Sequence, residues 1–265
     1  METEEKKVSS KKIFLIIICS IVGAVMIYYA IMNILAPIRK MKEINKEYAV
    51  VQDEKVKIDE KIYSDSAYLK LLKERSFLQS RIAMAESDSI YLTINLPDSA
   101  VNLEICGVVV HTTKIRRMDI SRIIREGNDN IISAMLGKPF SIENSFSTIP
   151  REPLMIKMAP KDTSEFVPDV VPDTANHVPV NFVLEMNNGT RIFIYQAEFP
   201  NHGDKFQLFK FDMKYRLQNA LNAIKRTALF KIPEYHPYIK LRIPKADANI
   251  IYRALPKHGQ IAVYR

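Results

Sequence analysis

Glycine and cysteine are both scarce in this sequence of 265 residues, which contains 7 glycines and 2 cysteines. Neither of the glycine patterns that bind nucleotide phosphates, GxxxxGK[ST] and GxGxxG, is present. Two thiols, Cys19 and Cys106, are too few for a zinc site with four thiolate ligands or for a disulfide framework. The sequence therefore gives no support to a nucleotide-binding loop or to a cysteine-based metal site.

Motifs of the common hydrolases are also missing. The five histidines do not form an HExxH pattern, and none of them combines with a cysteine at a spacing typical of metal ligands. The nucleophile patterns GxSxG and SxxK followed by KTG do not occur either. The sequence therefore predicts no metal site and no cofactor.

The overall composition is that of an ordinary folded chain, with 47% hydrophobic and 26% charged residues. Its formal net charge of +8 is unevenly distributed. Residues 205–265 contain thirteen basic and three acidic residues, whereas residues 159–204 contain two basic and seven acidic ones. These segments are either two solvated faces that balance each other, or a basic surface for an anionic polymer, lipid headgroups or an acidic protein.

One long segment lacks charge altogether. Residues 13–36 read IFLIIICSIVGAVMIYYAIMNILA, and a bilayer core of about 30 Å needs about 20 such residues in a helix. A cleaved signal peptide would have a shorter apolar region followed by a small-x-small cleavage site. The sequence therefore predicts an uncleaved transmembrane helix over 13–36, preceded by a cytoplasmic tail over 1–12.

Positive charges on the two sides of this segment are nearly equal. Four bases precede it and four follow within ten residues: Lys6, Lys7, Lys11 and Lys12 against Arg39, Lys40, Lys42 and Lys46. Positive charge alone thus leaves the orientation open. The short N-terminal part and the large C-terminal part favour a single-pass protein of the bacterial inner membrane, with a cytoplasmic N-terminus and an exported domain. Nucleic acid is not an expected partner of such a domain.

Residues 37–87 have the pattern of a long helical stalk. Pro37 is expected to break or kink the chain where it leaves the membrane. Apolar residues then recur at alternating steps of three and four, as in the seam of a coiled coil. The predicted seam consists of Met41, Ile44, Tyr48, Val51, Ile58, Ile62, Leu69 and Leu72, with Lys55 and Asp65 at two further seam positions. The stalk is either a coiled coil with itself or with other proteins, or a lone helix or one packed on its own domain.

Residues 88–265 are predicted to form a mostly β domain with two or three helices, so the fold class is α+β. Strands are expected over 89–96, 101–105 and 108–115 as an antiparallel meander, in which Cys106-Gly107 interrupts the run at a turn or bulge. Cys106 itself is interpreted as a buried strand residue. Asn187-Asn188-Gly189 indicates a hairpin between strands 180–186 and 190–196. Helices are expected over 129–136, 212–229 and 246–255, strands over 238–243 and 261–264, and a long loop over 160–180.

The C-terminal part contains His236-Pro237-Tyr238-Ile239-Lys240-Leu241, followed by Pro244-Lys245-Ala246-Asp247-Ala248 and later by Gly259 and a short strand. This order resembles the C-terminal signature of the L,D-transpeptidases, which cross-link peptidoglycan and whose motif runs His-Gly-Cys-Ile-Arg-Leu. The resemblance extends over residues 88–265 and is weakest between Ile120 and Gln196.

On this resemblance Tyr238 stands where the family has its nucleophilic cysteine, and Lys240 replaces the arginine. A phenol with a pKa of about 10 is a poor substitute for a thiol with a pKa of about 8.5. Pro237 also lacks the backbone N–H of the glycine that it replaces. The resemblance therefore implies a non-catalytic module whose degenerate groove would be lined by His202, His236, Tyr238, Lys240 and Arg242.

These features together predict a membrane-anchored scaffold subunit of the cell envelope. Its expected partners are the lipid bilayer, other envelope proteins and a second copy through the stalk, and it is not expected to be an enzyme. The alternative is a peptidoglycan-binding pseudoenzyme, or a cell-wall-modifying relative of the L,D-transpeptidases.

Overall fold

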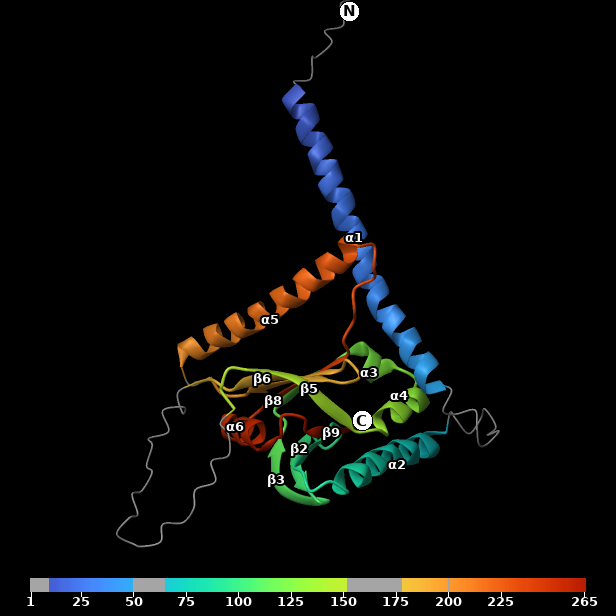
Figure 1. Cartoon of the computed structure of the whole chain (residues 1–265), viewed down its shortest axis with the longest axis vertical. Coiled ribbons are helices and arrows are strands. Elements are labelled where there is room, and N and C mark those ends of the chain that lie inside the picture. The colour runs from blue at the N-terminus through green and yellow to red at the C-terminus, as the bar shows by residue number, and fades with distance from the viewer. Residues whose placement is uncertain (1–9, 50–64, 152–177, 200) are drawn as a thin grey trace, which may run out of the picture. The chain divides into compact units, whose positions relative to one another are not determined.

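The computed structural model describes residues 10–49, 65–151, 178–199 and 201–265 (Figure 1). The chain forms two units, residues 1–43 with 215–235 and residues 44–214 with 236–265. The second unit contains all nine strands of a mixed sheet, so the expected α+β class is confirmed. The helices and strands are α1 Ser10–Ala49, α2 Ser66–Ala85, β1 Tyr91–Asn95, β2 Ala100–Ile105, β3 Val108–Lys114, β4 Arg117–Ile120, α3 Arg122–Glu126, α4 Asp129–Leu136, β5 Phe140–Ser147, β6 Asn181–Met186, β7 Arg191–Gln196, α5 His202–Ala228, β8 Tyr238–Ile243, α6 Lys245–Ala254 and β9 Gln260–Tyr264.

Helix α1 contains the apolar segment. Among the described residues it is the one helix long and apolar enough to cross a membrane, and its most apolar stretch is not buried. This is compatible with a membrane anchor or with a signal helix. The helix continues through Pro37, so the break expected there does not occur. A proline within a helix still removes one backbone hydrogen bond at that point.

The strands follow one another in the order β3-β2-β1-β9-β5-β6-β7-β8-β4. Parallel pairing joins β1 to β9 and β7 to β8, and the other neighbours are antiparallel. The end strands β3 and β4 are separated by only Ile115 and Arg116. Ile115 donates its N–H to Ser99 and Arg116 donates to Arg242, at 2.7 and 2.8 Å. The two ends of the sheet are thus joined by one bent strand, and the strand pairings form a closed circuit.

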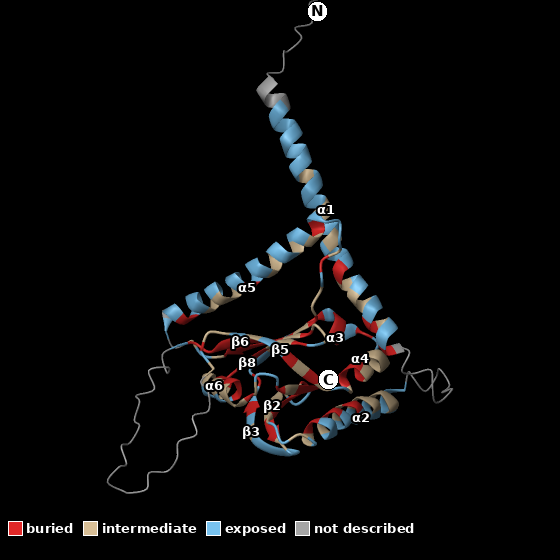
Figure 2. Cartoon of the chain, viewed as in Figure 1, coloured by how far each residue is buried: buried red, intermediate tan, exposed pale blue. Residues whose placement is uncertain are grey.

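Buried residues are concentrated on the strands, and β1, β6 and β7 are buried along most of their length (Figure 2). Strand β8 alternates between half-exposed and buried residues, and Ile239, Leu241 and Ile243 are its buried set. Phe182 of β6 packs against Tyr252 of α6, with ring centroids 4.9 Å apart. The alternation along β8 therefore reports one face turned to the core.

The continuous stalk helix expected over 37–87 is corrected by the structure. Helix α1 ends at Ala49, and α2 begins with its own cap at Asp65. The Asp65 backbone is extended, and its carboxylate accepts a hydrogen bond from the Ala67 N–H at 3.0 Å. An extended residue cannot lie within a helix, so the helix is interrupted here.

The residues of the predicted seam are found in different places. Ile44 and Tyr48 of α1 are buried and Met41 is half-buried, whereas Val51, Ile58 and Ile62 lie outside the described residues. Leu69 and Leu72 are half-buried on α2. Because α2 packs on α4 and β9, residues 66–85 follow the alternative of a helix packed on its own domain. The coiled-coil stalk is not confirmed.

Local turn chemistry predicted the hairpins well. Strands β1, β2 and β3 form the expected meander, and β6 and β7 flank Gly189, which has a φ of 78°. The interruption expected at Cys106-Gly107 is a turn, but the expected burial of Cys106 was wrong, because its side chain is exposed. Cys106 and Gly107 have φ values of 48° and 81°, the left-handed pair that a type I′ turn between β2 and β3 requires.

Candidate functional site

The structure brings three of the five predicted groove residues together. Tyr238, Lys240 and Arg242 alternate along β8 with its buried residues, so their side chains share the outer face of the sheet. The same face receives Phe193 and Tyr195 from β7, which pair with Lys240 and Arg242 in register. The outer face of β7 and β8 is therefore both aromatic and basic.

The cations on this face lie over the aromatic rings. The Lys240 Nζ is 4.7 Å from the ring centroid of Tyr238 and 5.4 Å from that of Phe193. The Arg242 guanidinium carbon is 5.3 Å from the Phe199 centroid and 5.9 Å from the Tyr195 centroid. Such cation–π contacts contribute about 0.5–1 kcal/mol each where water has access. They order two flexible basic side chains in front of an aromatic surface.

Burial raises the pKa of the Tyr238 phenol above its usual value of 10.0, and the carboxylate of Asp119 on β4 raises it further, against an opposing effect of Arg125. A group held protonated in this way is a weak nucleophile at neutral pH. The environment of Tyr238 is therefore unlike that of an activated nucleophile.

The raised pKa has a measurable consequence at alkaline pH. Because the folded state holds this proton more tightly, the contribution of Tyr238 to stability is constant below about pH 10 and is lost as the pH rises through the folded pKa. We expect an alkaline difference titration at the phenolate absorption band to show that Tyr238→Phe removes one phenol that titrates above pH 10. A lost phenol that titrates below pH 10 would contradict this description of the site.

The two histidines of the predicted groove lie elsewhere. His236 precedes β8, and its Nδ1 donates to the Gly189 carbonyl at 3.0 Å, in the turn between β6 and β7. His202 is the first residue of α5. Within the described parts of the chain, no group of three histidine, cysteine or acidic residues is placed to hold a metal ion.

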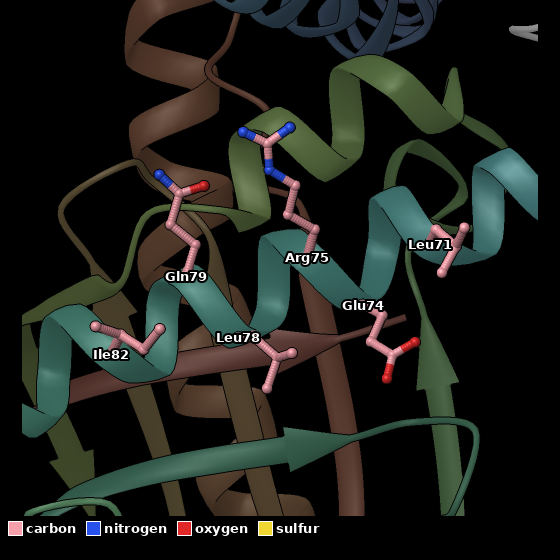
Figure 3. Close-up of a pocket in the computed structure, with 6 residues that line it drawn as sticks. All are labelled: Leu71, Glu74, Arg75, Leu78, Gln79 and Ile82. Carbon is pink, nitrogen blue, oxygen red and sulfur yellow. The ribbon is translucent and has the colours of Figure 1, made fainter.

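A second candidate site is an apolar groove along the outside of α2. Figure 3 shows its six lining side chains, which all project from this helix: Leu71, Glu74, Arg75, Leu78, Gln79 and Ile82. Leu71 and Ile82 are each 64% exposed and Leu78 is 45% exposed. Their spacing of seven and four residues places them on one stripe, opposite the buried Ser76, Ser80 and Met84.

A second group of exposed apolar residues lies at the start of β3, close to the end of α2. Val108, Val109 and Val110 are three consecutive exposed valines, between 45% and 63% accessible. The preceding Gly107 lies against Ala85 at the end of α2, where an added Cβ would be 3.8 Å from the Ala85 Cβ. We call these three valines together with Leu71, Leu78 and Ile82 the α2–β3 surface.

Helix α2 is fixed to the sheet by a buried ion pair. Arg81 places its Nε 3.0 Å and its Nη2 2.9 Å from one carboxylate oxygen of Glu104 on β2. Glu104 is 1% exposed, and its other oxygen accepts a hydrogen bond of 2.7 Å from the Thr93 hydroxyl. Next to this pair Met84, Tyr91 and Ala262 form a buried cluster. The α2–β3 surface is therefore presented on a rigid support.

A second charged cluster holds the other end of α2. Asp129 of α4 lies 3.2 Å from Lys73 of α2 and 3.1 Å from Arg265. The cavity between α2, α4 and β9 has a volume of only about 10 Å³, with room for about one water molecule. The interface beneath α2 is thus closely packed, and its outer side is the accessible one.

Sequence reasoning missed the α2–β3 surface because it assigned residues 66–86 to the stalk. The sequence did contain a sign of it, since Leu78 and Ile82 depart from the phase of the predicted seam.

Comparison with protein-family models, with curated proteins and with solved structures gives no significant match for this chain.

Proposed function

We propose that the protein is a single-span, membrane-anchored scaffold subunit whose β-sheet domain binds a partner protein through the α2–β3 surface. The observation that carries this proposal is the exposed stripe of Leu71, Leu78 and Ile82 on a helix that is already packed on its other side. Contiguous exposed apolar residues of this kind mark interaction sites. In the proposed arrangement α1 crosses the bacterial inner membrane from a cytoplasmic N-terminus, and the sheet domain is exported.

The partner that fits the stripe best is an amphipathic helix. A spacing of seven and four residues matches the seam between two packed helices, and Glu74 and Arg75 beside it can pair with charges of either sign. The valines of β3 extend the apolar contact beyond the end of α2.

The test is affinity purification of the full-length protein in mild detergent, followed by mass spectrometry. We expect stoichiometric envelope proteins to co-purify, and Leu78→Asp to reduce their recovery roughly tenfold or more, since a residue at the centre of an interface contributes about 2 kcal/mol. Ala83→Asp is the matched control, because it adds the same charge to an exposed position of α2 outside the groove. Equal recovery with both variants would assign the partner to another surface.

The alternative function, wall binding by a non-catalytic relative of the L,D-transpeptidases, is supported by the basic and aromatic face of β8. Lys240 and Arg242 hold two positive charges beside aromatic rings, which suits an anionic polymer that contains sugars. Recovery of muropeptides without any protein partner would favour this alternative. Sedimentation with isolated cell wall, weakened by salt, would then be the next measurement.

A further inference from the structure

Helix α5 exposes a continuous apolar stripe along its whole length. Six large residues are each between 49% and 68% exposed: Phe206, Phe209, Met213, Leu217, Leu221 and Ile224. Figure 2 shows most of this helix in the colour of exposed residues. A water-exposed stripe of this size on a helix of 27 residues needs a covering surface.

Basic residues flank this stripe on both sides. At 3.6 residues per turn, the six apolar residues fall within about 120° of the helix circumference. Lys205 and Arg216 lie along one border, Lys214 and Lys225 lie along the other, and Lys210 lies just inside the second border. The whole helix contains six basic residues and two acidic ones, Asp204 and Asp212. An apolar stripe with lysines and arginines at its borders is the pattern of a helix that lies in a membrane interface.

The C-terminal end of α5 lies next to the apolar helix. Phe230, two residues beyond α5, packs on Tyr28 of α1 with ring centroids 6.0 Å apart, within the first unit of the chain. Tyr28 precedes the end of the apolar segment at Ala36 by eight residues, or about 12 Å along the helix. This contact holds the end of α5 beside the segment that would cross a bilayer.

We propose that α5 binds the membrane surface, with its apolar stripe buried in the acyl region and its bordering lysines and arginines at the headgroups. Lipid is favoured over a second copy of the chain because cations border the stripe on both sides and because Phe230 contacts the segment that would cross the bilayer. The inference shares only the anchor α1 with the proposed function. It assigns the sheet domain a second, reversible attachment to the membrane.

The test uses the absence of tryptophan from the chain, since any tryptophan introduced reports alone. The full-length Leu221→Trp variant is reconstituted into vesicles of phosphatidylcholine and phosphatidylglycerol, with and without lipids brominated on their acyl chains. Its control is Asn222→Trp, the adjacent exposed residue that points away from the stripe. An interfacial helix buries its apolar face by about 5–10 Å, so bromines near the headgroups should quench Leu221→Trp roughly threefold more than Asn222→Trp.

Three other results would overturn the proposal. Equal quenching of both tryptophans by aqueous iodide, with no effect of brominated lipid, would show that the stripe remains in water. A Leu221→Trp residue shielded from iodide but not quenched by bromine would show that protein covers it. Equal quenching of both tryptophans by brominated lipid would show that α5 does not bury only its apolar face in the membrane interface. Flotation of the protein with the vesicles reports the α1 anchor separately, so failure of the anchor is distinguished from failure of α5 to bind.

Discussion

Replacing Arg81 with methionine should lower the free energy of unfolding of the sheet domain by about 3 kcal/mol. The substitution leaves the Glu104 carboxylate without its cation at a site that is 1% exposed, and an unpaired buried charge is strongly destabilising. For a domain of this size the melting temperature should fall by about 6–12 °C. Chemical unfolding of the full-length protein in mild detergent, followed by circular dichroism, measures the loss.

Arg122→Met is the matched control for this prediction. Arg122 forms an ion pair with Glu126 in which the two side chains are 82% and 48% exposed, and such surface pairs contribute about 0.5 kcal/mol or less. Adding Glu104→Gln to Arg81→Met should restore more than half of the loss, because the amide carbonyl still accepts from Thr93 and carries no charge. Equal losses for Arg81→Met and Arg122→Met would mean that α2 is not fixed to β2 in this way.

Phe182→Ala should destabilise the same domain by about 3–5 kcal/mol. The ring is fully buried on the inner face of β6 and packs on Tyr252, so its removal leaves a cavity that the surrounding strands cannot close. Phe146→Ala on the neighbouring strand β5 should cost about 1 kcal/mol or less, since Phe146 is 41% exposed. The denaturant midpoints of the two variants give the comparison. A larger loss of stability for Phe146→Ala than for Phe182→Ala would show that the inner and outer faces of the sheet are wrongly assigned.

The sequence predicted the elements that depend on local chemistry. Asn187-Asn188-Gly189 specifies a hairpin because its glycine adopts a positive φ at no cost, and helix α4 has the predicted bounds. Strand β8 also has its predicted bounds, because the alternation of apolar and polar residues from Tyr238 to Ile243 is regular. Helix α5 begins ten residues earlier than predicted, at His202 rather than Asp212.

The pairings between distant strands could not be read in the same way. Strands β1 and β9 lie side by side although more than 160 residues separate them, and nothing in either strand alone specifies this parallel pairing. Strand β5 was missed because its residues Glu143, Asn144 and Ser145 interrupt the apolar alternation at a bulge. Strand β4 has only four residues, and just two of them are apolar.

The candidate sites also combine features set by the local sequence with features set by contacts between distant elements. Tyr238, Lys240 and Arg242 lie on one face because alternate residues of one strand share a face. All five predicted groove residues came from the resemblance to the L,D-transpeptidases, and the structure places His236 at the Gly189 turn. The stripe on α2 depends on which side of the helix meets the sheet, which is decided by Arg81 and Glu104 from separate elements.

The position of β9 determines when this domain can acquire its structure. Strand β9 lies between β1 and β5, so the centre of the sheet stays incomplete until residues 260–264 have left the ribosome. A nascent chain therefore presents β1 and β5 without the neighbour that joins them, and long-range pairing of this kind forms slowly. The two halves of the sheet are therefore joined only once its last strand has been synthesised.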